Sequence, residues 1–186
     1  MPDPRFNNLS DSDLVEICNS GTRRAATEAF DSLYRRHRDY VTRVALRFCS
    51  DRDVAEDVLQ ETFLYLLRKF PPSGEGLVLT ARLRSLLYPV ARNLTLTAVR
   101  QARRRAQTEE LEPDRSPDPR TVDPHYENLA RAMQGLSDRH REVLLLRFVD
   151  GMRLNEMAEA LDVPPGTVKS RLHFAVSALR RKLKIT

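Results

Sequence analysis

The first residues that could do chemistry form an acidic cluster between positions 53 and 61. The apolar residues around them recur at helical spacing, so the segment from about Asp53 to Phe70 is expected to be a helix. An acidic face with an apolar residue at its centre is typical of a surface that docks a protein partner. On a helical wheel, that face consists of Asp53, Glu56, Asp57, Gln60, Glu61 and Leu64.

Two other interpretations of the acidic cluster remain open. Asp57 and Glu61 are four residues apart and could bind a divalent metal, but no histidine or second acidic motif completes such a site. A metal enzyme is therefore disfavoured, and neither a metal nor a cofactor is expected. A simply solvated helix face is the plainer alternative. Cys18 and Cys49 have no metal-ligand spacing, which favours two reduced, partly buried thiols over a redox switch.

Positive charge is concentrated in two blocks. Residues 92–105 contain five arginines and no acid, residues 166–186 contain six lysines and arginines and no acid, and residues 106–125 contain six acids against two arginines. The whole chain has a net charge of +5. Two cationic blocks indicate two contacts with a polyanion such as nucleic acid. Complementation of helix dipoles is the alternative, and it explains one block more easily than two.

Residues 154–183 carry a helix-turn-helix pattern. A short helix over 154–161 is followed by a turn at Asp162-Val163, and Pro164-Pro165 opens a second helix to about 183. One side of that helix is an apolar stripe made of Val168, Leu172, Ala175, Leu179 and Leu183. The opposite side is polar and then basic, with Thr167, Lys169, Ser170, His173, Phe174, Ser177 and Arg181. This pattern favours a helix that recognises duplex DNA over an ordinary amphipathic helix of a bundle.

Phe174 lies on the outward side of this helix in the wheel. We expect it to contact a thymine methyl group, a protein partner, or the first helix of its own domain.

These residues must be positioned by helices, because the chain contains no convincing strand pattern. Ser10 is expected to cap a helix that ends near Gly21, and Ser50 the helix that Pro71-Pro72 stops. Pro89 predicts a kink or a break in the helix over 81–105. The remaining helices are expected over 25–48, 126–135, 137–149, 154–161 and 165–183, with a loop over 71–80.

The fold class predicted from these elements is all-α. We expect two small helical domains, an N-terminal helical bundle and a C-terminal helix-turn-helix domain, joined by a flexible, acidic, Pro-rich linker over 106–125. No run of eighteen apolar residues and no signal-peptide pattern is present, so no membrane insertion and a cytoplasmic location are expected.

Three stretches in this order resemble the extracytoplasmic-function (ECF) sigma factors of the sigma-70 family. They are DVAEDVLQETF (53–63), ARN followed by an arginine-rich helix end (91–105), and GTVKSRL (166–172). The resemblance extends from Leu9 to Leu183. It implies a sigma domain 2 over 9–105, a linker over 106–125 that threads the RNA exit path, and a sigma domain 4 over 126–186. It also implies a protein without enzymatic activity.

The resemblance further implies partners and site residues. Core RNA polymerase would bind the acidic helix, with Phe63 added to the six residues above. The loop over 71–80 would capture a flipped base of the −10 promoter element. The single strand would be bound by Arg92, Asn93, Arg100, Arg103 and Arg104. The −35 duplex would be recognised by Thr167, Lys169, Ser170, Arg171, His173 and Phe174. An anti-sigma factor is a further expected partner, and the chain is expected to be a monomer when free of polymerase.

Four positions depart from the family pattern: no Trp stands near 86, Thr97 replaces a common Asp, Arg153 replaces a Ser-type cap, and Phe174 replaces a basic residue. Two other functions remain as alternatives. A stand-alone helix-turn-helix regulator with a helical sensor domain would dimerise on a palindromic site. An adaptor that binds only proteins is disfavoured by the acid-free recognition helix.

Overall fold

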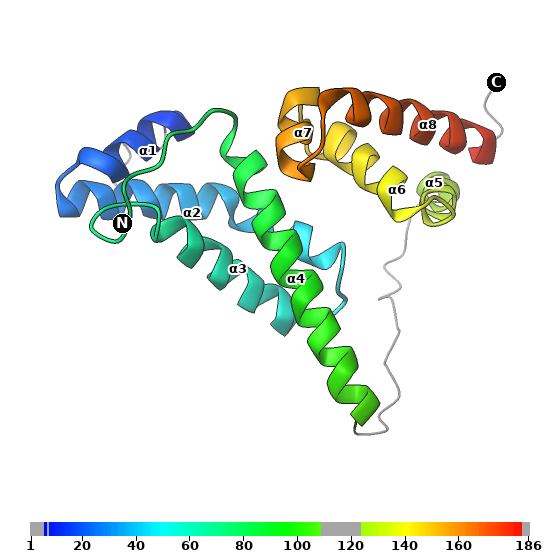
Figure 1. Ribbon diagram of the computed structural model, residues 1–186, viewed down its shortest axis with the longest axis horizontal. Helices are drawn as coiled ribbons and strands as arrows, with labels where there is room; N and C mark the ends of the chain where they lie inside the picture. Colours follow the sequence, from blue (N-terminus) through cyan, green and yellow to red (C-terminus); the bar gives the residue numbers. More distant parts are fainter. Residues whose placement is uncertain (1–5, 7, 109–123, 184–186) are drawn as a thin grey trace. The chain divides into compact units, whose positions relative to one another are not determined.

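The computed structural model describes residues 6, 8–108 and 124–183. These residues form helices without a strand, which confirms the all-α class (Figure 1). The chain divides into two compact units, residues 1–117 and 118–186. Most of the expected linker, residues 109–123, lies outside the described residues.

The first unit is built from four helices: α1 (Asp11–Ser20), α2 (Arg23–Leu46), α3 (Arg52–Leu67) and α4 (Leu83–Thr108). Its core consists of the inward faces of these helices, because each presents apolar residues at helical spacing. Leu33, Tyr40 and Val44 of α2 are fully buried, as are Leu66 of α3 and Leu87 of α4. Figure 1 shows α1, α3 and α4 lying against the long α2.

The start of α1 is fixed to α2 by Asp11. The Asp11 carboxylate lies 2.7 Å from the Arg36 guanidinium and 2.7 Å from Nε2 of the buried His37. Burial alone would raise the pKa of Asp11, but its contacts with His37 and Arg36 outweigh burial and lower that pKa. Leu14, Val15 and Cys18 then bury the inward side of α1. The position of this helix is therefore set at its first turn and along its length.

The second unit contains α5 (Pro124–Gln134), α6 (Asp138–Leu144), a π-helical segment (Leu145–Val149), α7 (Leu154–Leu161) and α8 (Pro165–Leu183). The Arg141 guanidinium donates hydrogen bonds to the carbonyls of Met133, Gln134 and Leu136, at 3.0, 2.9 and 3.1 Å. These bonds satisfy carbonyls at the end of α5 that have no partner within the helix. They thereby fix the connection between α5 and α6.

Several boundaries match the sequence-based expectations and others do not. Ser10 caps α1, and Gly21 follows its last residue, as expected. Asp51, not Ser50, caps α3, because its carboxylate accepts the N–H groups of Asp53 and Val54. Pro89 does not divide α4, which runs as one helix across it. The π-helical segment was not expected; it interrupts the helix predicted over 137–149.

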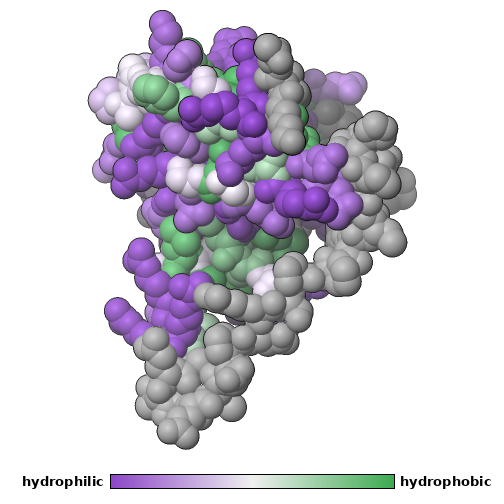
Figure 2. Space-filling model, turned by 90° about the vertical axis from the view of Figure 1, so that its right-hand side faces the viewer, coloured by the Kyte–Doolittle hydropathy of each residue, from purple (hydrophilic) through white to green (hydrophobic). Residues whose placement is uncertain are grey.

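The described surface carries both polar and large apolar side chains. The face drawn in Figure 2 is largely hydrophilic, and patches of hydrophobic residues lie between the polar ones. Among the described helices, none is long and apolar enough to span a membrane.

Candidate functional site

The acidic face predicted on α3 is exposed. Asp53, Glu56, Asp57, Gln60 and Glu61 are all exposed in the first unit. Leu64 belongs to the same face and is 41% exposed, although it is a large apolar residue. The helix itself is secured by its opposite side, where Ala55, Val58, Thr62 and Leu66 are buried. The structure therefore presents four carboxylates around an apolar centre on a rigid helix.

Phe63, which the resemblance implies as a polymerase contact, does not lie on this exposed face. Its side chain is 4% exposed, and its ring packs edge-on against Phe30 and Tyr34 of α2, with centroid separations of 6.2 and 4.8 Å. Phe63 directly precedes Leu64, but its side chain points to a different side of α3, because successive helical residues are rotated by about 100°. Phe63 supports the acidic face from beneath it.

Leu67 was missed by the sequence analysis. It is 47% exposed and follows Leu64 by three residues, so it lies on the same face one turn later. It also borders a groove of about 790 Å³ whose other lining residues include Phe30, Phe70 and Pro71. A helical wheel extended past residue 64 places Leu67 on the acidic face as well. The apolar part of the α3 face therefore extends toward the end of the helix.

Metal and thiol chemistry find no support in the described part of the chain. No group of three or more His, Cys, Asp or Glu residues there could bind a metal ion. Cys18 and Cys49 are free, as expected. Burial raises the pKa of the Cys18 thiol to about 11, and burial together with the charge of Asp51 raises the pKa of Cys49. Both thiols are therefore protonated and weakly nucleophilic near neutral pH.

The arginine-rich helix α4 carries one polar stripe along its second half. Asn93, Thr97, Arg100 and Arg104 follow one another at spacings of four, three and four residues, which places them on one side of the helix. Asn93, Thr97 and Arg100 are exposed, as are the residues from 101 to 105. The helix contains six arginines and no acid, so this stripe is strongly cationic. It spans about 16 Å from Asn93 to Arg104 at 1.5 Å per residue.

Two of the five predicted single-strand residues lie beside this stripe. Arg103 is exposed on its flank. Arg92 is only partly exposed, and its guanidinium lies over the Phe48 ring, 5.8 Å from the ring centroid. This cation–π contact orients the Arg92 side chain toward the turn that follows α2. Arg92 is therefore a less accessible cation than Arg100 or Arg103.

The loop between α3 and α4, residues 68–82, is anchored to α1 by one side chain. Asn19 Nδ2 donates to the Leu77 carbonyl at 2.8 Å, and Asn19 Oδ1 accepts the Leu77 N–H at 2.8 Å. Gly76, the preceding residue, has a φ of +101°, and its N–H donates to the Lys69 carbonyl. Val78, the following residue, is 83% exposed. The sequence predicts this loop but not the side chain that anchors it.

In the second unit, α8 presents the polar face that the wheel predicted. Lys169, Ser170, His173 and Phe174 are exposed, whereas Thr167 and Arg171 are partly buried. Of the predicted apolar stripe, Val168 and Ala175 are fully buried. The helix contains five lysines and arginines and no acid, with three of them in its last turn. Its exposed side is therefore polar at the start and cationic at the end.

Phe174 is 60% exposed, so the described helices of its own unit do not cover it. Its ring contacts His173 edge-on, with centroids 5.5 Å apart. Of the three contacts expected from the sequence, packing against its own domain covers less than half of this side chain. An apolar ring remains available for an external contact.

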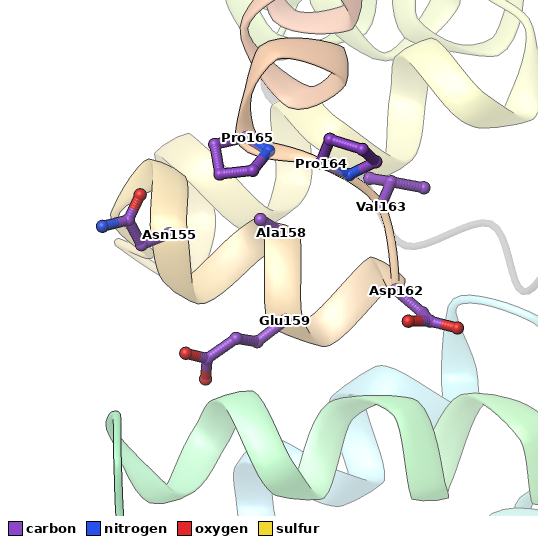
Figure 3. Close-up of a pocket in the computed structure, with 7 residues that line it drawn as sticks. All are labelled: Asn155, Ala158, Glu159, Asp162, Val163, Pro164 and Pro165. Atoms are coloured by element: carbon purple, nitrogen blue, oxygen red, sulfur yellow. The ribbon is translucent and has the colours of Figure 1, made fainter.

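The turn before α8 has a sharp backbone. Asp162 has a left-handed conformation with φ 50° and ψ 52°, and the Val163 N–H returns to the Ala158 carbonyl. A hollow of about 540 Å³ borders this turn. Figure 3 shows Ala158 lying beneath Pro164 and Pro165, while Glu159 and Asp162 extend their carboxylates away from the prolines. This geometry sets the direction in which α8 begins.

The departure at Arg153 is compensated by Glu156. The Glu156 carboxylate accepts the Arg153 N–H at 2.6 Å and is itself buried at the start of α7. Arg147 of the π-helical segment donates to the carbonyl of Met152, in the loop before α7, at 2.9 Å. The helix-turn-helix is thus capped without the hydroxyl of a Ser-type cap. Phe148 and Val149 of the π-helical segment are highly exposed and were not singled out from the sequence.

The chain is similar to known proteins over both units. The family described as "Sigma-70 region 2" matches residues 33–105, and "Sigma-70, region 4" matches residues 126–179. The ECF RNA polymerase sigma factor SigL of Mycobacterium tuberculosis is 36% identical over 171 residues, which cover 89% of this chain and 94% of that protein.

Two solved structures share the fold. RpoE of Bartonella quintana, crystallised with the anti-sigma factor NepR, aligns with a TM-score of 0.62 at 23% identity, covering 84% of this chain and 97% of RpoE. CnrH, in complex with the cytosolic domain of CnrY, aligns with a TM-score of 0.63 at 24% identity, covering 94% of this chain and 97% of CnrH.

Proposed function

This chain belongs to the ECF RNA polymerase sigma factors of the sigma-70 family, and from that premise we propose which of its surfaces perform each step of transcription initiation. As a sigma factor it acts with core RNA polymerase, recognises promoter DNA and promotes its melting. The alternative of a stand-alone regulator is not favoured, because the family matches extend over both units.

The proposed polymerase-binding surface is the exposed face of α3. It consists of Asp53, Glu56, Asp57, Gln60, Glu61, Leu64 and, added from its exposure, Leu67. Carboxylates around an apolar centre favour a protein partner with a complementary basic rim, because the charges steer association and the leucines supply buried apolar area. This exposed acidic face with an apolar centre is the single observation that carries the proposal.

The proposed −10 surface combines the α3–α4 loop with the cationic stripe of α4. Unpaired DNA is typically bound by a positively charged surface that follows the backbone, together with contacts to unstacked bases. Asn93, Arg100 and Arg104 supply the polar and cationic stripe, and Arg92 and Arg103 flank it. Melting is then driven by preferential binding to the unpaired state, so the chain needs no hydrolytic chemistry of its own.

The proposed −35 surface is the exposed face of α8. Lys169, Ser170, His173 and Phe174 are positioned to contact base edges in the major groove, while the basic last turn of the helix contacts phosphates. Thr167 and Arg171 are less exposed than these four and are proposed as flanking contacts. Residues 9–105 and 126–186 would then act as the two promoter-binding domains.

We further propose that an anti-sigma factor regulates this chain and that it acts in the cytoplasm as a monomer until it binds polymerase. Support comes from the similarity to RpoE, which was crystallised with the anti-sigma factor NepR. The partner of this chain is to be identified by co-purification from its own host.

The test of the proposed function is run-off transcription with purified core enzyme, followed by mapping of the start sites. We expect specific transcripts that require the chain, and upstream sequences that share two elements at a constant spacing. Failure of the chain to associate with core enzyme at low salt would overturn the proposal.

A further inference from the structure

We propose that Asn19 of α1 is a positioning residue for −10 recognition, because it fixes the backbone of the α3–α4 loop from a helix that lies outside the promoter-binding surface. The inference rests on the proposed function of that loop. It goes beyond that function by assigning a specificity role to a residue 58 positions away in the chain.

The contact between Asn19 and Leu77 has the geometry of a paired peptide group. The side-chain amide donates to one carbonyl and accepts from the N–H of the same residue, both at 2.8 Å. Leu77 offers one donor and one acceptor, so only one orientation of the Asn19 amide satisfies both groups. Both bonds are partly buried, which makes their loss costlier than that of an exposed bond.

Gly76 allows the loop to approach this amide. Its φ of +101° belongs to a region that side-chain-bearing residues rarely adopt. A Cβ at this position would lie 3.1 Å from Asn19 Oδ1, closer than an ordinary contact. The Gly76 N–H donates to the Lys69 carbonyl at 3.0 Å, which ties the same turn back to the end of α3. The loop is thus held to α1 through Leu77 and to the end of α3 through Gly76.

This anchoring fixes the backbone next to Val78. It directly follows the fixed residue and is 83% exposed, the largest value among the exposed large apolar side chains of the described chain. An exposed valine on a backbone fixed one residue earlier is suited to contact an unstacked base, because its position is determined before DNA binds. Anchoring of this kind sharpens discrimination between bases more than it raises affinity.

Asn19 is itself held in place by its own helix. The first turn of α1 is joined to α2 through Asp11, Arg36 and His37, and the Asn19 amide lies in the last turn of α1. Figure 1 shows the loop passing α1 before it enters α4. Leu77 is therefore held in place relative to the core of the first unit, and not only by contacts within the loop.

The test uses the full chain bound to core polymerase and a library of duplex templates. In the library, the −10 element of a promoter used by the unsubstituted holoenzyme is randomised, and transcripts are sequenced to obtain the base preference at each position. Asn19→Leu removes both hydrogen bonds at similar size, and Gly76→Ala disturbs the same contact from the loop side. Ser20→Ala is the matched control, since its exposed hydroxyl donates to Glu16 in its own helix.

We expect Asn19→Leu and Gly76→Ala each to lower the preference at one or two −10 positions by about tenfold, and Ser20→Ala to leave it unchanged. The double variant is expected to lose no more than the stronger single variant, because both substitutions break one contact. Asn19→Asp is not expected to rescue the preference, because its carboxylate faces the Leu77 carbonyl. Thermal unfolding and core binding, measured on the same variants, separate loss of specificity from loss of fold.

Val78→Asp distinguishes failure of this inference from failure of the loop assignment. If Val78→Asp changes the −10 preference while Asn19→Leu leaves it sharp, or lowers all templates equally, the positioning role is overturned and the loop assignment stands. If neither Val78→Asp nor Gly76→Ala changes the preference, the loop does not contact the −10 element, and both are overturned.

Discussion

The exposed faces of α3 and α8 have opposite chemistry although both helices are secured by an apolar side. α3 has five buried residues and presents four acids around Leu64, whereas α8 has two buried residues and presents five cations and no acid. An apolar residue within a ring of like charge suits a protein surface, because it supplies area that can be desolvated. A face without acids suits phosphate. In both helices, the exposed side determines which kind of partner can bind, whereas the buried side holds the helix in its domain.

The largest effect is expected for the acidic face of α3. Reversing charge with Asp57→Arg and Glu61→Arg should weaken binding to core polymerase by at least about 100-fold, since like charges at an interface cost several kcal/mol. Both residues are exposed, so thermal unfolding should change little. Binding is measured by titration of labelled chain into core enzyme. Glu16→Arg with Asp39→Arg makes the same change in net charge elsewhere on the unit, and equal weakening by this control pair would refute the assignment.

The next effect concerns α8. Lys169→Ala with Ser170→Ala should lower transcription from a promoter with an intact −35 element by about tenfold, because each good base contact contributes about 1–3 kcal/mol of discrimination. Core binding should remain unchanged. Run-off assays with intact and scrambled −35 elements measure the effect, with Arg139→Ala, an exposed cation of the same unit, as control. A parallel loss of core binding would mean that α8 is not a specificity helix.

A smaller effect, on the salt dependence of DNA binding, is expected for α4, the other cationic helix. Arg100→Ala with Arg104→Ala should reduce the slope of log affinity against log salt by about 1.4, at about 0.7 for each phosphate contact to single-stranded DNA. Holoenzyme binding to a template with a pre-melted −10 region gives this slope. Arg35→Ala with Arg38→Ala, whose guanidinium groups lie beside Asp31 and Asp39, should leave it unchanged. An unaltered slope in the α4 variant would exclude a backbone contact there.

The smallest effect is expected for Phe174→Ala. The side chain is 60% exposed, so the free energy of unfolding should change by no more than about 0.5 kcal/mol. If the ring contacts a thymine methyl group, preference for thymine at one −35 position should fall about two- to threefold. Transcription from single-base −35 variants measures this preference. A marked drop in thermal stability would show that the ring packs within the protein after all.

The sequence was sufficient for the helices and for most of the exposed faces. Periodicity and capping patterns predicted α1, α7 and α8 closely, because amphipathic spacing and local caps are encoded within a few residues. The same locality explains the errors. Ser50 and Asp51 are both capable caps, and only the backbone of the turn decides between them.

The site residues were harder to predict where burial depends on the neighbouring helix. Phe63 belongs to a matching motif, yet its side chain packs on α2. The helical wheel already leaves it off the acidic face, so it was the motif, and not the periodicity of α3, that added it to the contact residues. The Asn19–Leu77 contact joins residues 58 positions apart, so no local signal could reveal it. Glu156 capping Arg153 could have been predicted, because a Glu three residues after the cap position is a known helix-start signal.

The contact that Asn19 makes with the main chain has a consequence for how such proteins diversify. The amide binds only the main chain of residue 77, so apart from the glycine at position 76 it places no demand on the side chains that the loop carries. If the loop has its proposed function, substitutions at its other positions are expected to alter which promoters are used while the path of the loop stays unchanged. A duplicated gene could acquire a new regulon by a few exchanges at the loop tip, without first passing through a misfolded ancestor.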